Sequence, residues 1–414
     1  MDSLRPRDVK DVEQSVRDAL AADQTLEIVG QGTKRAIGQP AAANAVLELA
    51  ALNAVKGYEP SELILTVESG APLADIESLI DAKNQEFAFE PMDPAALLGT
   101  SGGRGTVGGM IAAGLAGPRR VRSGGVRDHL LGAKAVSGFG EAFAAGGKVV
   151  KNVTGYDLCK LLAGSWGTLA VMTEVTLKVM PKAETVSTLV LSGLDDITAN
   201  RAMTAALGSP FDVSGAAHIP ASALRDDGVG LDGVGAAGQA LTLIRLEGIG
   251  VSVADRARSL AAALAGFGRA EIVSGEAQSR GLWLAIRDVT PFAAAGPVGA
   301  WPVWRVVCPP ASGGHFGDAF ARETGGDLIY DWGGGLIWAA LPPTADGCAV
   351  RLRDRLKAIG GHAVLIRGGE DLRAAIDVFQ PLEPGVAALS RRVKASFDPK
   401  DIFNRNRMAR GTGA

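Results

Sequence analysis

The first third of the chain combines two helical repeats with short apolar stretches. In residues 7–22, "RDVKDVEQSVRDALAA", apolar side chains recur every three or four positions, and residues 72–84 show the same spacing. Pro72 opens the second repeat, where its missing N–H is harmless. Three stretches have the composition of strands: residues 25–30, 45–52 and 62–72. The pattern predicts a compact α+β unit.

Strand patterns continue after a glycine-rich block. Residues 130–138 and 141–150 are two apolar stretches joined by polar turn residues, which predicts a hairpin. Residues 167–181, "GTLAVMTEVTLKVMP", alternate between apolar and polar side chains in the manner of a strand. Pro181 and the polar run after it indicate a boundary near residue 182.

The second half mixes strand-like and helical stretches. Examples are "ALTLIRLEG" and "GGLIWAALPP" for strands, and "ADRARSLAAALAGFG" for a helix. This order favours an antiparallel sheet with helices on one side, and the tail is predicted to be a helix followed by a turn. We therefore expect an α+β fold in three parts, which are residues 1–182, 183–380 and 381–414.

Composition narrows the classes of function. A net charge of −3 gives no reason to expect a nucleic-acid partner or an anionic membrane surface. No apolar run approaches the roughly 20 residues that span a bilayer, and the N-terminus lacks an apolar signal segment. We expect a cytoplasmic chain that meets a membrane only through partner proteins.

Cysteine and histidine are scarce. Cys159, Cys308 and Cys348 lie far apart, and only four histidines are present. The spacing offers neither a disulfide framework nor an iron–sulfur or zinc site. We predict no metal site in this chain.

Glycine is the unusual residue, with 55 in the chain and 14 of them between Gly102 and Gly147. A first glycine loop, Gly30-Gln31-Gly32-Thr33-Lys34, follows a predicted strand. It is not the dinucleotide fingerprint G-x-G-x-x-G, because Arg35 occupies the third glycine position. The P-loop pattern fails as well, since "GGKVV" has no hydroxyl residue after its lysine.

A second glycine loop spans residues 101–128 and can share a ligand with the first. Thr106, Gly108 and Gly109 stand where backbone N–H groups near a helix start can bind a diphosphate. Cations follow at Arg119, Arg120, Arg122 and Arg127. The alternative is that these glycines serve only tight turns.

Three motifs together resemble a known family. They are "GQGTK", "GTVGGMIAAGLAGPRRVRSGGVRDHLLGAKAV" and "KNVTGYDLCKLLAGSWGTLAVMTEVTLKV", in this order. Residues 5–182 are similar to the FAD-binding domain of the vanillyl-alcohol-oxidase/p-cresol-methylhydroxylase (PCMH) superfamily. The resemblance implies a PCMH-type FAD-binding domain in residues 1–182, followed by an α+β cap domain with an antiparallel sheet.

The resemblance also implies which residues contact FAD. No histidine precedes His129, so covalent attachment through the first loop is not expected and the FAD is predicted to be non-covalent. The cofactor-binding candidates are Gly30, Gln31, Gly32, Thr33, Lys34, Thr106, Gly108, Gly109, Gly117, Ser123, Gly124, Asp128, Asn152, Asp157 and Val171.

The second half resembles a narrower family. Stretches such as "DWGGGLIWAALP" and "VFQPLEPGVAALSRRVKASFDPKDIFN" are similar to the FAD-binding (E-type) subunits of bacterial glycolate oxidase. The tail departs from that family, because Asn404-Arg405-Asn406 stands where Asn-Pro-Gly is usual. The resemblance implies a second flavin subunit and an iron–sulfur subunit as partners, and glycolate or a related 2-hydroxy acid as substrate.

A complete active site is not evident. Related catalytic subunits carry a "GHxGDGNxH"-like metal motif, whereas residues 314–320 read "GHFGDAF" and lack the second histidine. We interpret His315 as a loop histidine. Arg287 and Arg305 follow tryptophans on what we read as apolar strands, and each is either a carboxylate clamp or a buried Arg–Asp pair, with Asp288 or Asp331. Tyr156 either donates to the flavin edge or caps a core.

Three functions stay open. The first is a subunit of an FAD-dependent glycolate oxidase complex that passes electrons to an iron–sulfur partner. The second is a flavin-bearing structural or relay subunit without turnover of its own. The third is a stand-alone FAD oxidase for a sugar or lactone, which the same fold can support.

Overall fold

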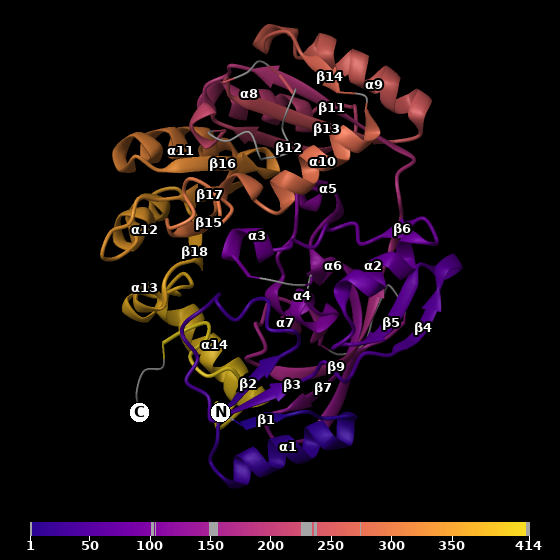
Figure 1. Cartoon of the computed structure of the whole chain (residues 1–414), viewed down its shortest axis with the longest axis vertical. Coiled ribbons are helices and arrows are strands. Elements are labelled where there is room, and N and C mark those ends of the chain that lie inside the picture. The colour runs from indigo at the N-terminus through magenta and orange to yellow at the C-terminus, as the bar shows by residue number, and fades with distance from the viewer. Residues whose placement is uncertain are drawn as a thin grey trace.

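The computed structural model describes residues 2–100, 103, 105–148, 156–224, 234–235, 238–273 and 275–410. In Figure 1 the first half of the chain forms the lower part of the molecule and the large sheet of the second half forms the upper part. The gold C-terminal helix α14 (Pro384–Phe397) returns to the lower part of the molecule. Within the described residues, no helix is long and apolar enough to cross a membrane.

The described residues of the first half form three sheets. The predicted hairpin is confirmed, since its two strands pair antiparallel within a five-stranded sheet. That sheet has the order β4 (Val55–Glu59), β5 (Ile64–Glu68), β9 (Ala170–Lys178), β7 (Leu130–Ser137), β8 (Ala142–Gly146). A parallel sheet has the order β1 (Asp2–Leu4), β3 (Ala45–Glu48), β2 (Leu26–Val29), and a third sheet pairs β6 (Gln85–Glu86) with β10 (Met180–Pro181).

Helix α1 (Val9–Ala21) covers the parallel sheet. Asp8 caps its start, because the side chain accepts a hydrogen bond from the N–H of Asp11. The helical repeat read from the sequence turns Val12 and Val16 inward, where they pack with Leu26 and Phe403 in one buried cluster. A C-terminal phenylalanine thus completes the core of the N-terminal unit.

The second half is built on an eight-stranded sheet whose neighbouring strands are all antiparallel, as the sequence predicts. Its order is β14 (Glu271–Val273), β11 (Thr185–Ser192), β13 (Leu241–Gly248), β12 (Val213–Ile219), β16 (Asp327–Asp331), β17 (Leu336–Ala340), β15 (Val303–Val307), β18 (His362–Arg367). We call this sheet the cap sheet.

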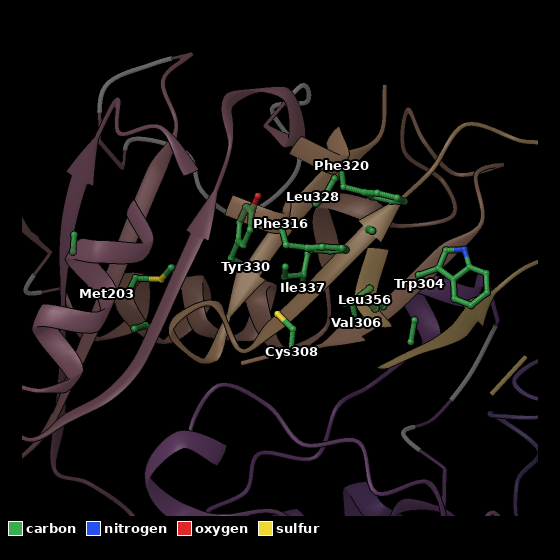
Figure 2. Packing of buried hydrophobic residues seen from close by; sticks show 14 of the residues in the cluster. Met203, Trp304, Val306, Cys308, Phe316, Phe320, Leu328, Tyr330, Ile337 and Leu356 are labelled. Atoms are coloured by element: carbon green, nitrogen blue, oxygen red, sulfur yellow. The ribbon is translucent and has the colours of Figure 1, made fainter. Parts of the chain in front are cut away.

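The two faces of the cap sheet have different roles. The outer face packs against helices in the core shown in Figure 2, where Trp304, Phe316 and Tyr330 are buried. These outer helices are α8 (Asp196–Leu207), α9 (Gly250–Ala263), α11 (Pro310–Thr324) and α12 (Ala349–Lys357). The inner face packs against α10 (Glu276–Arg287) and against first-half residues such as Ala113 and Leu115.

Two sequence expectations on the second half are wrong. Arg287 is the last residue of α10, because Leu282, Trp283 and Ile286 recur at helical spacing and bury one side of that segment. His315 lies on α11, where its side chain is exposed, and not in a loop. The glycines around it let α11 approach its neighbours closely, since a Cβ on Gly317 would lie 2.1 Å from the Tyr330 hydroxyl oxygen.

The tail begins with α14 (Pro384–Phe397) and then returns to the first half. Phe403 bridges to Leu26, and Asn404 accepts a hydrogen bond from the N–H of Ile28 at 2.8 Å. The remaining helices of the described residues are α2 (Leu73–Asp81), α3 (Ala95–Leu98), α4 (Val107–Ala113), α5 (Arg120–Ser123), α6 (Val126–His129), α7 (Cys159–Leu162) and α13 (Glu370–Ala375).

Candidate functional site

The two glycine loops meet and form one wall of a groove. A Cβ on Gly30 would lie 2.2 Å from the Thr106 Oγ1, and one on Gly105 would lie 2.6 Å from the Thr33 Oγ1. An open groove lies beside them. The lining is Ile28–Arg35, Leu49, Ser69, Thr106, Gly108, Gly109, Ala112, Ala113, Trp166, Gly167, Ala170, Met172, Asn404 and Arg407.

The first loop offers backbone donors to this groove. Gly32 has a φ of +73°, a left-handed conformation that suits glycine. In the described part of the chain, the backbone N–H groups of Gly30, Gln31, Gly32 and Thr33 donate to no oxygen. Adjacent unpaired N–H groups of this kind form a concave site for an anion.

Arg407 supplies a buried cation at the same place. Its Nη2 donates to the Lys34 carbonyl oxygen at 2.7 Å, and its guanidinium lies 5.7 Å from the Trp166 ring centre. Burial lowers the pKa of Arg407 to about 10, so the side chain is still charged at neutral pH. Its Nε has no hydrogen-bond partner among the described residues. A buried donor without a partner beside a groove suits an anionic ligand.

The second loop uses its amides internally, contrary to expectation. The N–H of Gly108 donates to the Ser69 carbonyl at 2.7 Å, and the N–H of Gly109 donates to the Thr106 Oγ1 at 3.2 Å. Gly108 is needed for packing, since a Cβ there would lie 2.7 Å from the Ser69 Cβ. This loop shapes the groove, while the first loop carries the unpaired donors.

The other cofactor candidates do not line the groove. Gly117 donates to the carbonyls of Phe89 and Glu90, and its own carbonyl accepts from Trp332. Ser123 ends α5, Gly124 follows it, and Asp128 lies within α6. Asp157 is exposed, Val171 is buried in a core, and Asn152 lies outside the described residues.

Several lining residues were missed by the sequence reading. Ser69, Trp166, Met172, Asn404 and Arg407 come from four separate segments. In the sequence, the run "NRNRM" near the end signals only a departure from a family pattern. Its Asn404 ties the tail to the groove, since the Nδ2 donates to the Trp166 carbonyl at 2.8 Å.

Arg287, Arg305 and Tyr156, the other candidates from the sequence, do not line the groove. Arg287 forms two hydrogen bonds to its neighbour Asp288, at 2.7 and 2.8 Å. It therefore forms an Arg–Asp pair, the alternative to a carboxylate clamp. Arg305 is half-buried, and burial, together with repulsion by Arg120, lowers its pKa to about 10. Tyr156 is 91% exposed and caps no core. No group of three or more His, Cys, Asp or Glu in the described residues is placed to hold a metal ion.

Comparison with known proteins shows which family the chain belongs to. The chain is 30% identical to the glycolate oxidase subunit GlcE of Escherichia coli (strain K12) over 400 residues, which cover 95% of each protein. The chain belongs to the GlcE family. It is also 31% identical to the glycolate oxidase subunit GlcD of Bacillus subtilis (strain 168), over 45% of this chain and 38% of that protein.

Two further comparisons concern the domain and the fold of this GlcE family member. Residues 3–146 match the family described as FAD binding domain. The fold resembles p-cresol methylhydroxylase with substrate bound, with a TM-score of 0.70, 14% identity, and coverage of 98% of this chain and 88% of that one. The chain therefore has the predicted α+β fold with a PCMH-type FAD-binding domain and a large antiparallel sheet.

Proposed function

We propose that the groove binds the diphosphate of FAD through the first glycine loop and Arg407. The observation that carries the proposal is a set of four N–H groups, Gly30 to Thr33, beside the Nε of Arg407, all without a hydrogen-bond partner among the described residues. A diphosphate would satisfy these donors and neutralise the buried cation. The match of residues 3–146 to an FAD binding domain supports the same ligand.

We propose further that the FAD is non-covalent. The residues that line the groove in the described part of the chain include no histidine, cysteine or tyrosine. His129, the first histidine, is buried, and its Nε2 faces the Ser123 carbonyl at 2.9 Å. These three residue types would be the candidates for a covalent bond to the flavin, so the described lining supports a non-covalent FAD.

The reaction we propose is the oxidation of glycolate, or a related 2-hydroxy acid, to the 2-oxo acid within a complex. Bound FAD would accept the hydride. The partners would be a second flavin subunit and an iron–sulfur subunit that takes the electrons onward. Support comes from the relationship to GlcE along 95% of the chain and from the shorter relationship to GlcD. In the cell, the chain would then be cytoplasmic and reach the membrane only through its partners.

Flavin binding and the cap would be formed by different parts of the chain. We propose that residues 1–182 and the tail, residues 381–414, form the flavin-binding unit, and that residues 183–380 form the cap. The tail enters the flavin-binding unit because Arg407 and Asn404 contact the first loop and Trp166.

The first test is the visible absorbance spectrum of the purified full chain, before and after acid precipitation. A flavin spectrum that passes to the supernatant is expected for bound, dissociable FAD. Gly30→Ala should lose the flavin, because its Cβ would collide with Thr106. Gly57→Ala is the matched control, since a Cβ there meets nothing within 4 Å and its φ is not positive. A wild-type chain that is colourless and cannot be reconstituted would refute the proposal.

The second test separates turnover from relay. The flavin-loaded chain and the assembled complex are mixed with glycolate without oxygen, and flavin bleaching is followed. Bleaching of the isolated chain shows that its flavin takes hydride directly. Bleaching of the complex alone favours the relay subunit.

A further inference from the structure

Within the part of the chain that the structure describes, two guanidinium groups lie against Trp332 without a carboxylate at ion-pair distance. Arg120 lies 4.5 Å from the Trp332 ring centre, and Arg305 lies 5.1 Å from it. Among the described residues, neither guanidinium makes an ion pair or a hydrogen bond. Exposed arginines often lack partners, but Arg305 is half-buried, and an unpaired cation there is costly.

Trp332 is held rigidly in this place. Its φ is +53°, which is unfavourable for a bulky residue, and its side chain is buried at 5% exposure. Its Nε1 donates to the Gly117 carbonyl at 3.0 Å, and its backbone N–H donates to the Asp331 carboxylate at 2.7 Å. The indole therefore fixes the end of β16 against the segment that leads into α5, where Arg120 lies.

The two arginines come from the two halves of the molecule. Arg120 begins α5 of the first half, and Arg305 lies on β15 of the cap sheet. Side chains alternate along a strand, so Arg305 shares a face with Val303, which packs in the same cluster as Leu115 and Trp332. Arg305 therefore points toward the junction between the halves.

We infer that Arg120 and Arg305 form the binding site for the carboxylate of the substrate, a small 2-hydroxy acid. The inference rests on the proposed function and names a substrate contact for it. A planar guanidinium binds a carboxylate with two parallel hydrogen bonds, and here each half of the chain contributes one such group. A bound carboxylate would neutralise both cations, which repel one another in the free protein.

The test uses isothermal titration calorimetry of the full chain with oxalate, a dicarboxylate that the flavin cannot oxidise by removing hydride from a C–H bond. Arg305→Met and Arg120→Met should each weaken oxalate binding about tenfold or more, and the double variant should abolish it. Arg305→Lys keeps the positive charge but loses the planar guanidinium that forms two parallel hydrogen bonds. Its affinity for oxalate should lie between those of Arg305→Met and the wild type. Arg122→Met is the control, because Arg122 lies on the same helix but pairs with Asp212 at 2.7 Å.

The outcomes are distinct. Oxalate binding that both single variants retain, or no binding by the wild-type chain, overturns the inference. Inorganic phosphate that binds as tightly as oxalate shows a general anion site and also overturns it. The flavin spectrum of each sample is recorded alongside, and the titration is repeated on chain stripped of flavin. A failure of FAD binding is thus seen separately from a failure of carboxylate binding.

Discussion

Arg119 and Arg120 are neighbours in the chain, yet they lie in two different electrostatic environments. Arg119 is buried at 8% exposure and contacts Glu247 at 2.7 and 2.9 Å and Glu86 at 2.9 Å. Arg120 makes no ion pair within the described residues and stacks on Trp332. One arginine closes the joint between the halves of the molecule, and the next one is left available for a ligand.

The paired region is a network of buried charges. Arg245 binds both carboxylate oxygens of Glu90, at 2.8 and 2.9 Å, and stacks on Trp283. Burial would raise the pKa of Glu247, but Arg245 and Arg119 outweigh it and lower the pKa to about 2. Glu247 therefore stays ionised at any pH near neutrality, and its contribution to stability is lost only as the pH falls from about 4 toward 2.

The contrast shows how the same residue type serves stability or binding. A buried arginine with its hydrogen bonds satisfied by fixed carboxylates holds two elements together and has no capacity left for a ligand. A half-buried arginine without such partners weakens the fold slightly and is available to an anion. The following predictions test this difference, from the largest expected effect to the smallest.

Removing a cation from the paired network should be severely destabilising. Among the ion pairs of the described residues, Arg245→Met leaves Glu90 and Glu247 buried with Arg119 as their remaining partner. We expect a loss of about 3–5 kcal/mol in the free energy of unfolding. Urea denaturation monitored by tryptophan fluorescence measures it. A loss below about 1 kcal/mol would show that the network does not hold the halves together.

The buried carboxyl of Asp331 should make stability depend on pH. Burial raises its pKa to about 7, so the folded chain keeps a proton that the unfolded chain releases near pH 4. Stability therefore falls as the pH rises from about 4 to 7. Asp331→Asn keeps an acceptor for the Trp332 N–H and should be more stable than wild type at pH 8, on the order of 1–3 kcal/mol. The difference in stability between Asp331→Asn and the wild type should shrink toward pH 5. A difference that does not change with pH would contradict a raised pKa of Asp331.

Removing a cation from the unpaired region should leave the fold intact. Arg305→Met keeps a long side chain against Trp332 and relieves the desolvation of the guanidinium. We expect the free energy of unfolding to stay the same or to rise by about 1 kcal/mol. The same denaturation experiment as for Arg245→Met measures it. A loss comparable to that of Arg245→Met would mean that Arg305 is structural.

An ion pair on the surface should give the smallest change in stability. Arg258 and Asp255 lie 3.2 Å apart on α9, and both side chains are 72% exposed. Solvent screens such a pair, so Arg258→Met should change stability by less than about 0.5 kcal/mol. Thermal denaturation at low and high salt checks it, and a larger effect would show that exposed pairs on the cap matter more than their geometry suggests.

Much of the architecture was readable from the sequence. The helical repeat of residues 7–22, the hairpin of residues 130–150 and the antiparallel second half were predicted, because periodicity reports which side of an element is buried. Eight candidate residues, Gly30 to Lys34, Thr106, Gly108 and Gly109, line the groove. The predictions for Arg287 and His315 were wrong. The apolar residues before Arg287 resemble a strand and the glycines around His315 resemble a loop, but both segments are helices.

By itself, the sequence determined the local backbone: the glycine that allows φ of +73° in the first loop, the faces of the helices, and the motifs that mark the family. Only the tertiary structure decided which charges are paired. Arg407 contacts a loop more than 370 residues away in the chain. Arg119 pairs with a carboxylate whereas Arg120 stacks on an indole, because the folded chain places different groups beside them. Local pattern specifies conformation, whereas the partner of a side chain depends on segments that are distant in sequence and meet only in the folded chain.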